Sequence, residues 1–224
     1  MNVLKRKGTK VGYCGEKLLK KEFTNMKNKY IELMEKRRSI YALGKNVEQT
    51  EEILQDIIME AIKHSPTAFN SQTSRAVILF NEHHDKLWDL VEEQLRSIVP
   101  AENFARTEEK IESFRAGFAS ILFFEDQDAI QQYQNQFALY AEQFPIWSEQ
   151  ATGIAQHSVW MALAQERIGA SLQHYNPLID QNVKDEWGIP DNWKLTAQMP
   201  FGSIEAVPSD KEFLANEERF KVFR

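Results

Sequence analysis

The feature that most constrains the fold of this chain is the segment FASILFFED, which occupies residues 118–126. Its apolar residues follow one another continuously instead of alternating with polar ones. A strand with one face in water alternates apolar and polar side chains, so a continuous run is typical of a strand that is buried on both faces. The segment therefore predicts the central strand of a sheet that other elements cover on both sides.

Three further segments are predicted to contribute strands. Residues 75–80, RAVILF, form a second short apolar run, and residues 191–206 give a last central strand with a glycine inside it. Residues 169–176, GASLQHYN, predict a short strand and a loop. Runs of this length with apolar and β-branched residues favour strands over helices.

Helical periodicity separates these strands. Residues 50–66 are the strongest case, because Thr50 can cap the start, an apolar stripe follows, and Pro66 lies beyond the end. The other predicted helices span residues 26–39, 84–99, 128–144 and 148–169. The resulting order of helices and strands predicts an α+β fold in which helices sandwich a small sheet.

Composition excludes several classes of protein. The 224 residues suit one domain, and 42% hydrophobic residues suffice for a core. No apolar run approaches the ~18–20 residues of a membrane span. The N-terminus lacks the apolar stretch of a signal peptide, and the lone Cys14 excludes an intrachain disulfide. We therefore expect a cytoplasmic protein that does not bind membranes.

The charge is unevenly distributed along the chain. Residues 1–25 carry a net charge of +5, whereas the whole chain carries −6, so the remainder is strongly acidic. An acidic body argues against nucleic-acid binding, which depends on phosphate neutralisation. We expect residues 1–25 to be a basic extension outside the folded core, with residues 26–224 as a single domain. The alternative is a basic arm that binds an acidic or membrane surface.

Side chains that could perform catalysis alone are not evident. The chain has no P-loop, GxGxxG, HExxH or GxSxG motif. The nearest candidate for a metal site is EHHD at residues 82–85, but we expect these histidines to lie in water on a turn after a strand. Either the chain is not an enzyme, or a bound cofactor carries the chemistry and the protein holds and orients it.

Two polar segments are candidates for holding such a cofactor. Arg37, Arg38 and Ser39 stand together at the end of a predicted helix, and arginine forks with a hydroxyl suit phosphate binding. Residues 65–72, SPTAFNSQ, are rich in amide and hydroxyl groups that can bond the edge of a flat heterocycle. Taken singly, the first could be a solvated helix end and the second an ordinary turn.

Together, the two segments resemble the flavin nitroreductase family. Members of that family open with a helix ending in an Arg-Arg-Ser-type box, followed by a helix and a Ser-Pro-Ser-x-x-Asn-x-Gln-Pro-Trp loop. Residues 164–177 resemble the family's stretch beside the reactive edge of the flavin, and residues 215–223 resemble its basic C-terminal segment. The resemblance covers residues 30–224. The segments GASLQHYNP and FRAGFASILFFED resemble those of a compact subgroup of the family found in bacteria and fungi.

The resemblance implies a mostly antiparallel central sheet sandwiched by helices, with a C-terminal tail that docks on a partner subunit. It also implies a homodimer with FMN at the interface. NADH or NADPH would reduce the flavin by hydride transfer, and after the nicotinamide leaves, a small-molecule oxidant would take two electrons in a ping-pong cycle. Nitroaromatics and quinones are the usual oxidants of the family.

The resemblance further implies roles for individual residues. The phosphate would be held by Arg37, Arg38 and Ser39, with Arg219 returning from the tail. The ribityl chain or ring edge would be contacted by Asn70 and Gln72, while the partner subunit would supply Ser65, Pro66 and Thr67. The region near the reactive ring would be lined by His174 and Tyr175.

The chain departs from the family pattern at three places. The Gln-Pro-Trp ending of the loop is here Gln72-Thr73-Ser74, which makes the loop less rigid. Tyr41 stands where members usually have Arg or Lys, and Gln173, His174 and Tyr175 replace common glycines. These differences place substrate preference in question. Two other classes of function remain open: a flavin- or partner-binding protein without turnover, and a basic-arm adaptor.

Overall fold

The computed structural model describes residues 28–224, which separate into two units, with the boundary between Glu35 and Lys36. The predicted basic extension, residues 1–25, lies outside the described residues. The first unit holds most of helix α2 (Lys29–Lys36), whose start is capped by Asn28, since its Oδ1 accepts a hydrogen bond from the Tyr30 amide at 2.9 Å. Helix α2 has no buried residues and is shorter than the helix predicted over residues 26–39.

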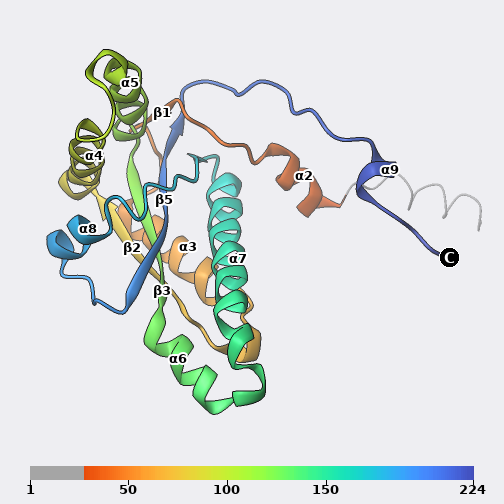
Figure 1. Cartoon of the computed structure of the whole chain (residues 1–224). Coiled ribbons are helices and arrows are strands. Elements are labelled where there is room, and N and C mark those ends of the chain that lie inside the picture. The colour runs from red at the N-terminus through yellow and green to blue at the C-terminus, as the bar shows by residue number, and fades with distance from the viewer. Residues whose placement is uncertain (1–27) are drawn as a thin grey trace, which may run out of the picture. The chain divides into compact units, whose positions relative to one another are not determined.

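The second unit contains an antiparallel sheet with the strand order β1-β5-β3-β2, and β4 also pairs with β5 (Figure 1). The strands are β1 (Leu43–Gly44), β2 (Ser74–Phe80), β3 (Ala119–Asp126), β4 (Gly169–Ala170) and β5 (Trp193–Ile204). Strand β3 lies between β2 and β5, and every residue from Ala119 to Glu125 is buried. The prediction of a central strand buried on both faces is therefore confirmed.

Helices cover both faces of this sheet, as Figure 1 shows. One face packs against α3 (Glu51–Lys63) and α7 (Phe144–Gln165), where Ile121 and Phe123 of β3 enter the core. The other face packs against α4 (Asn81–Arg96), α5 (Phe104–Arg115) and α8 (Asp180–Trp187), where Leu122 and Phe124 are buried. The α+β fold predicted from the order of elements is confirmed.

Local sequence explains where the strongest helix begins and what it buries. The hydroxyl of Thr50 accepts a hydrogen bond from the Ile53 amide at 3.4 Å, as expected of an N-cap residue. Leu54 and Ile58, four residues apart on one face of α3, are fully buried. The shorter elements are α6 (Gln127–Gln136), α9 (Asn216–Arg219), η1 (Ala68–Asn70), η2 (Ala101–Asn103) and η3 (Ala138–Gln143).

Helix α4 corrects the prediction made for residues 82–85. The helix begins at Asn81, so both histidines are helical, and His84 is fully buried instead of lying in water on a turn. Its Nδ1 lies 2.9 Å from the hydroxyl oxygen of Ser120, and its Nε2 lies 3.1 Å from the carbonyl oxygen of Arg115. His84 is thus a core residue with both ring nitrogens satisfied, and the described residues contain no cluster of three potential metal ligands.

The C-terminal tail after β5 leaves its aromatic side chains in solvent. Phe213, Phe220 and Phe223 are 76%, 58% and 91% exposed. No described helix combines the length and the apolar composition required to cross a membrane.

Gly202 provides a test of the packing between β5 and its neighbours. A Cβ atom at this position would overlap the carbonyl oxygen of Gly44 and lie 2.9 Å from the Phe118 amide nitrogen. Because both are backbone atoms, we expect Gly202→Ala to lower the free energy of unfolding by about 2 kcal/mol or more. Chemical denaturation of the purified variant measures this change.

Gly153→Ala is the matched control, because the same methyl group on α7 would meet no atom within 4 Å. We expect it to leave the free energy of unfolding unchanged or to raise it by up to about 1 kcal/mol. Equal stability of the two variants would contradict the packing described for β5.

Candidate functional site

The arginine segment is fixed beside the sheet by backbone contacts. Ser39 forms a parallel bridge with Ala170 of β4, and the Ile40 amide donates a hydrogen bond to the Ala170 carbonyl at 2.9 Å. Ile40 is buried, whereas Arg37, Arg38 and Ser39 are half-buried. The predicted phosphate-binding residues therefore stand on an ordered edge of the fold.

Three cationic groups gather at this edge. The Arg37 guanidinium lies 4.6 Å from the centroid of the Trp160 ring, and Arg38 donates a hydrogen bond to the Ser209 carbonyl at 2.6 Å. Burial and the charge of Arg38 lower the pKa of Arg37. Burial and the charges of both arginines lower the pKa of Lys211. Within the described part of the chain, none of the three forms an ion pair with a carboxylate, so together they can receive an anion.

Tyr41, two residues after Ser39 in the sequence, lines a large hollow. It has a volume of about 570 Å³ and lies on the side of the sheet covered by α4 and α5. Two predicted site residues, Tyr41 and Tyr175, line it together. The rest of its wall comes from the end of α4 and from α5: Leu95, Val99, Arg106, Thr107, Lys110 and Ser113.

The lining of this hollow suits a flat, negatively charged heterocycle. The Lys110 ammonium lies 6.0 Å from the centroid of the Tyr175 ring, and Arg106 stands one helical turn earlier. Neither cation forms an ion pair among the described residues. Burial raises the pKa of Tyr175 to about 12, so its phenol remains a neutral hydrogen-bond donor. Aromatic faces, cations and hydroxyl donors are the groups that hold an isoalloxazine ring, so these residues fit a flavin.

The loop of residues 65–72 forms a different hollow. Ser65, Thr67 and Gln72 line a cavity of about 160 Å³ together with Lys63, Ser74 and Arg75. The Gln72 amide donates a hydrogen bond to the Thr67 hydroxyl at 3.1 Å. Pro66 and Asn70 are exposed nearby and are not part of the lining. In one chain, these loop residues and the pair Tyr41 and Tyr175 belong to separate hollows.

Backbone strain marks this loop. Phe69, Asn70 and Gln72 have φ angles of 56°, 52° and 48°, in the left-handed region that residues other than glycine rarely occupy. Strain of this kind persists where the surrounding structure requires a particular loop shape, and it is common at functional sites.

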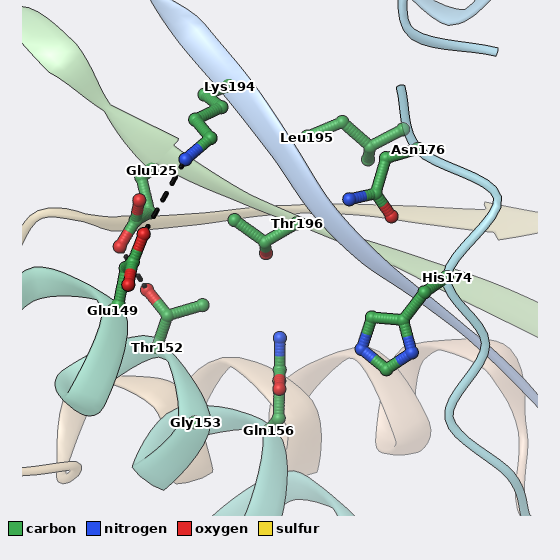
Figure 2. A pocket seen from close by; sticks show the side chains of 10 residues that line it. All are labelled: Glu125, Glu149, Thr152, Gly153, Gln156, His174, Asn176, Lys194, Leu195 and Thr196. Atoms are coloured by element: carbon green, nitrogen blue, oxygen red, sulfur yellow. Dashed lines mark hydrogen bonds and ion pairs between the residues drawn. The ribbon is translucent and has the colours of Figure 1, made fainter. Parts of the chain in front are cut away.

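The remaining predicted residues lie elsewhere. Gln173 is buried, its backbone pairs with that of Gln198, and its side chain donates to Ser171 at 3.1 Å. His174 lines a third cavity of about 400 Å³ on the α7 side of the sheet (Figure 2). Arg219 places its guanidinium over the ring of its own neighbour, Phe220, at 5.3 Å. The tail residues near the arginine segment are Ser209 and Lys211.

Sequence reasoning missed three cations of these sites: Arg106, Lys110 and Lys211. The first two lie on α5, a helix that the sequence analysis did not predict. Their spacing of four residues, which places them on one helical face beside the apolar positions Ile111 and Phe114, was the available signal. Nothing comparable in the sequence distinguishes Lys211 from the other charged residues of the tail.

Comparisons with known proteins show similarity in sequence and fold to nitroreductases. The sequence model of the Nitroreductase family matches residues 34–203. The Saccharomyces cerevisiae protein HBN1, which carries the name of a nitroreductase, is 35% identical over 190 residues, or 84% of this chain and 94% of HBN1. The nitroreductase CinD of Lactococcus lactis in complex with chloramphenicol is 49% identical with a TM-score of 0.80, covering 87% of this chain and 100% of CinD.

A more distant solved structure has the same fold. The nitroreductase of Desulfitobacterium hafniense with bound FMN is 14% identical and has a TM-score of 0.65, and the match covers 89% of this chain and all of that one.

The cluster of Arg37, Arg38 and Lys211 generates a prediction that needs no flavin. Inorganic phosphate should bind it and raise the free energy of unfolding, by about 1.4 kcal/mol at ten times the dissociation constant. Thermal unfolding over a phosphate titration at constant ionic strength measures this effect. Arg38→Gln should abolish the stabilisation, because it removes a cation that faces the other two.

Arg224→Gln is the control, since it removes one exposed cation of the tail. It should retain the full phosphate effect. Equal stabilisation of the Arg38 variant and the unsubstituted protein would exclude this cluster as an anion site.

Proposed function

The chain belongs to the nitroreductase family, and from this premise we propose that it is an FMN-dependent NAD(P)H oxidoreductase that reduces nitroaromatics or quinones in a ping-pong cycle. The observation that carries the proposal is the hollow of about 570 Å³, whose lining includes two tyrosines and two cations. When bound, FMN would accept a hydride from the nicotinamide and pass two electrons to the oxidant.

The residues of the chain would divide the work of holding this cofactor. Arg37, Arg38 and Ser39 would hold the phosphate, with Lys211 as the cation from the tail. Lys110 and Arg106 would lie beside the negative charge that develops on reduction, a fixed arrangement that favours the charged form. Tyr41 and Tyr175 would pack against the ring and exclude water from it. Since Tyr41 replaces the usual cation at its position, Lys110 would supply the positive charge on this side.

A group of aromatic side chains supports flat aromatic compounds as oxidants. Phe69 stacks on Trp147 with a centroid distance of 6.0 Å and also contacts Phe137 at 4.7 Å. Phe69 is 50% exposed and Tyr140 is 43% exposed, so part of this aromatic surface faces solvent. The related CinD binds chloramphenicol, a nitroaromatic compound, which favours the same class of substrate here.

Helix α7 supports a homodimer. An amphipathic helix on a protein surface has a polar outer face, but α7 carries apolar residues on all sides and leaves Ile146 and Ile154 48% and 41% exposed. A second copy packed on this face would cover them. The exposed aromatic residues of the tail would dock on the same partner, and the loop of residues 65–72 would complete the partner's flavin site.

Residues 26–224 would form the flavin domain, and the protein would work in the cytoplasm. The second candidate function is binding of a flavin or a partner protein without turnover. The exposed Phe213, Phe220 and Phe223 favour that reading, because a purely catalytic role does not require them.

The absorption spectrum of the purified protein tests the proposed function. We expect a yellow protein that bleaches when NADPH or NADH is added without oxygen and regains its colour with a quinone or a nitroaromatic compound. Lys110→Gln should bind FMN about 10- to 100-fold more weakly, as expected for the loss of a charge-assisted contact, and should shift the reduction potential of the flavin to more negative values.

Lys86→Gln is the matched control, because Lys86 is an exposed residue of α4 that pairs with Glu186. It should leave FMN affinity and potential unchanged. A protein that remains colourless after incubation with FMN would refute the proposed function, and a flavoprotein that does not bleach would favour binding without turnover.

The dimer generates a separate prediction. Ile154→Glu places a charge on the exposed face of α7 and should shift the molecular mass in solution from that of a dimer to that of a monomer, because the charge would be buried at the interface. Light scattering coupled to size-exclusion chromatography measures the mass. Ile98→Glu is the control, since Ile98 is 62% exposed beyond the end of α4. A monomeric parent protein, or a dimeric Ile154 variant, would contradict this interface.

A further inference from the structure

At the end of the central strand lies a buried carboxyl group that forms no ion pair with a cation among the described residues. Glu125 of β3 is only 2% exposed, and its side chain points toward α7 and lines the cavity of about 400 Å³ (Figure 2). Lys194, the nearest cation of the lining, pairs with Glu149 at 3.7 Å instead. Ionised carboxylates are rarely buried without a partner, so the position calls for a chemical explanation.

Hydroxyl groups are the polar groups that contact Glu125. The Thr152 hydroxyl donates a hydrogen bond to Glu125 Oε1 at 3.3 Å, which Figure 2 marks with a dashed line. The Ser148 hydroxyl also bonds this carboxyl group, and it lies 2.8 Å from the hydroxyl of Thr73. Thr73, Ser148 and Thr152 are all buried.

The surroundings favour the protonated form of Glu125. Burial is the largest effect and raises the pKa of the carboxyl group, and the charge of Glu149 acts in the same direction. The hydroxyls of Ser148 and Thr152 and the charge of Lys194 oppose this rise without cancelling it. The imidazole of His174 is the other titratable group in the lining of the cavity. Glu125 can therefore retain a proton at a pH where an exposed glutamate has lost it.

The hydroxyls also connect two cavities. Thr152 lines the cavity of Glu125, and its oxygen lies 3.3 Å from the hydroxyl oxygen of Ser74. Ser74 faces Glu125 across the β2–β3 ladder and lines the hollow of Ser65, Thr67 and Gln72. The Thr152 hydroxyl donates to Glu125 when the carboxyl group is ionised. When the carboxyl group carries a proton, its O–H can donate to Thr152 instead, and the Thr152 hydroxyl is free to donate to Ser74, so Glu125, Thr152 and Ser74 form a continuous path for a proton.

We propose that Glu125 is the proton donor of the reductive reaction and that Thr152 and Ser74 relay its proton to the hollow of residues 65–72. This inference rests on the proposed function, in which that hollow adjoins a flavin and its oxidant.

The proton balance of quinone reduction explains the need for such a donor. Two-electron reduction of a quinone forms two O–H bonds, and a hydride supplies both electrons but only one of the two hydrogens. The second hydrogen must arrive as a proton. In the relay, the O–H bond of Glu125 breaks as Thr152 gains a proton, Thr152 passes its own proton to Ser74, and Ser74 protonates the oxygen of the acceptor. Water in the cavity of Glu125 then returns a proton to the carboxylate.

Two isosteric variants interrupt the path at different points. Glu125→Gln keeps the shape of the side chain without an acidic proton, and Thr152→Val removes the linking hydroxyl. Each variant should slow the reoxidation of the reduced protein by a quinone about 10- to 100-fold. This loss lies at the lower end of the rate enhancement that general acids provide. Stopped-flow absorption measures this step. Flavin content and the rate of reduction by the nicotinamide should remain those of the unsubstituted protein.

Two control variants separate the relay from a general effect of altered polarity. Thr152→Ser retains the hydroxyl and should keep the reoxidation rate within about twofold. Ser148→Ala removes a hydroxyl that bonds the same carboxyl group but does not lie between Thr152 and Ser74, and it should also stay within about twofold. A Glu125→Gln variant with unchanged reoxidation, or a Ser148→Ala variant as slow as Thr152→Val, would overturn the relay.

Unfolding at different pH values provides a readout that needs no flavin. A carboxyl group whose pKa is raised in the folded state contributes stability that is present below the ordinary glutamate value of about 4.3 and is lost as the pH rises through the folded-state value. The difference in the free energy of unfolding between the parent protein and Glu125→Gln should therefore fall with rising pH in that window. A difference independent of pH would show that Glu125 titrates normally and would overturn the proposal.

The two readouts distinguish failure of this inference from failure of the proposed function. A protein that binds no flavin refutes the proposed function and with it the relay, whatever the titration of Glu125. A protein that undergoes flavin reduction and reoxidation normally, with a Glu125→Gln variant as fast as the parent at every pH, refutes the relay alone.

Discussion

The burial of β3 on both faces is the constraint on which the rest of the second unit depends. Ile121 and Phe123 face α3 and α7, while Leu122 and Phe124 face α4, α5 and α8, so each layer of helices covers apolar surface that the other cannot reach. Burying a large apolar side chain contributes about 1.5–3 kcal/mol, and the strand directs such side chains to both sides. The layers end where the strand becomes polar, at Glu125 and Asp126, and the cavity lined by His174 lies at that end of β3.

Side chains that alternate in direction along extended backbone explain why adjacent site residues line different hollows. His174 lines the cavity on the α7 side of the sheet, whereas Tyr175 lines the hollow beside α5. A sequence motif places such residues together, but successive side chains of extended backbone point in opposite directions. The loop of residues 65–72 belongs to a third hollow. The predicted site residues of one chain therefore line three separate hollows.

The sequence predicted the elements whose signals are local and strong. The continuous apolar run identified β3, and the cap and stripe identified α3. The grouped arginines lie on an ordered edge of the fold, where anion binding stays a prediction. Helix α5 escaped prediction because its three buried residues, Phe104, Ile111 and Phe114, are scattered among charged positions. Lys110 and Arg106 were missed with it. His84 appeared solvated for a similar reason: a short polar run looks like a turn, and only the approach of Ser120 and the Arg115 carbonyl makes its burial favourable.

Features that oppose folding coincide with the residues assigned a function. Arg37, Arg38 and Lys211 repel one another although the chain as a whole is acidic, and Glu125 is buried without an ion pair to any described cation. Phe69, Asn70 and Gln72 adopt a backbone conformation that costs free energy at each position. The burial of β3 between the two layers of helices requires none of these features. In the function and the relay that we propose, the unsatisfied charge would receive an anion, the carboxyl group would supply its proton, and the strained loop would shape the site.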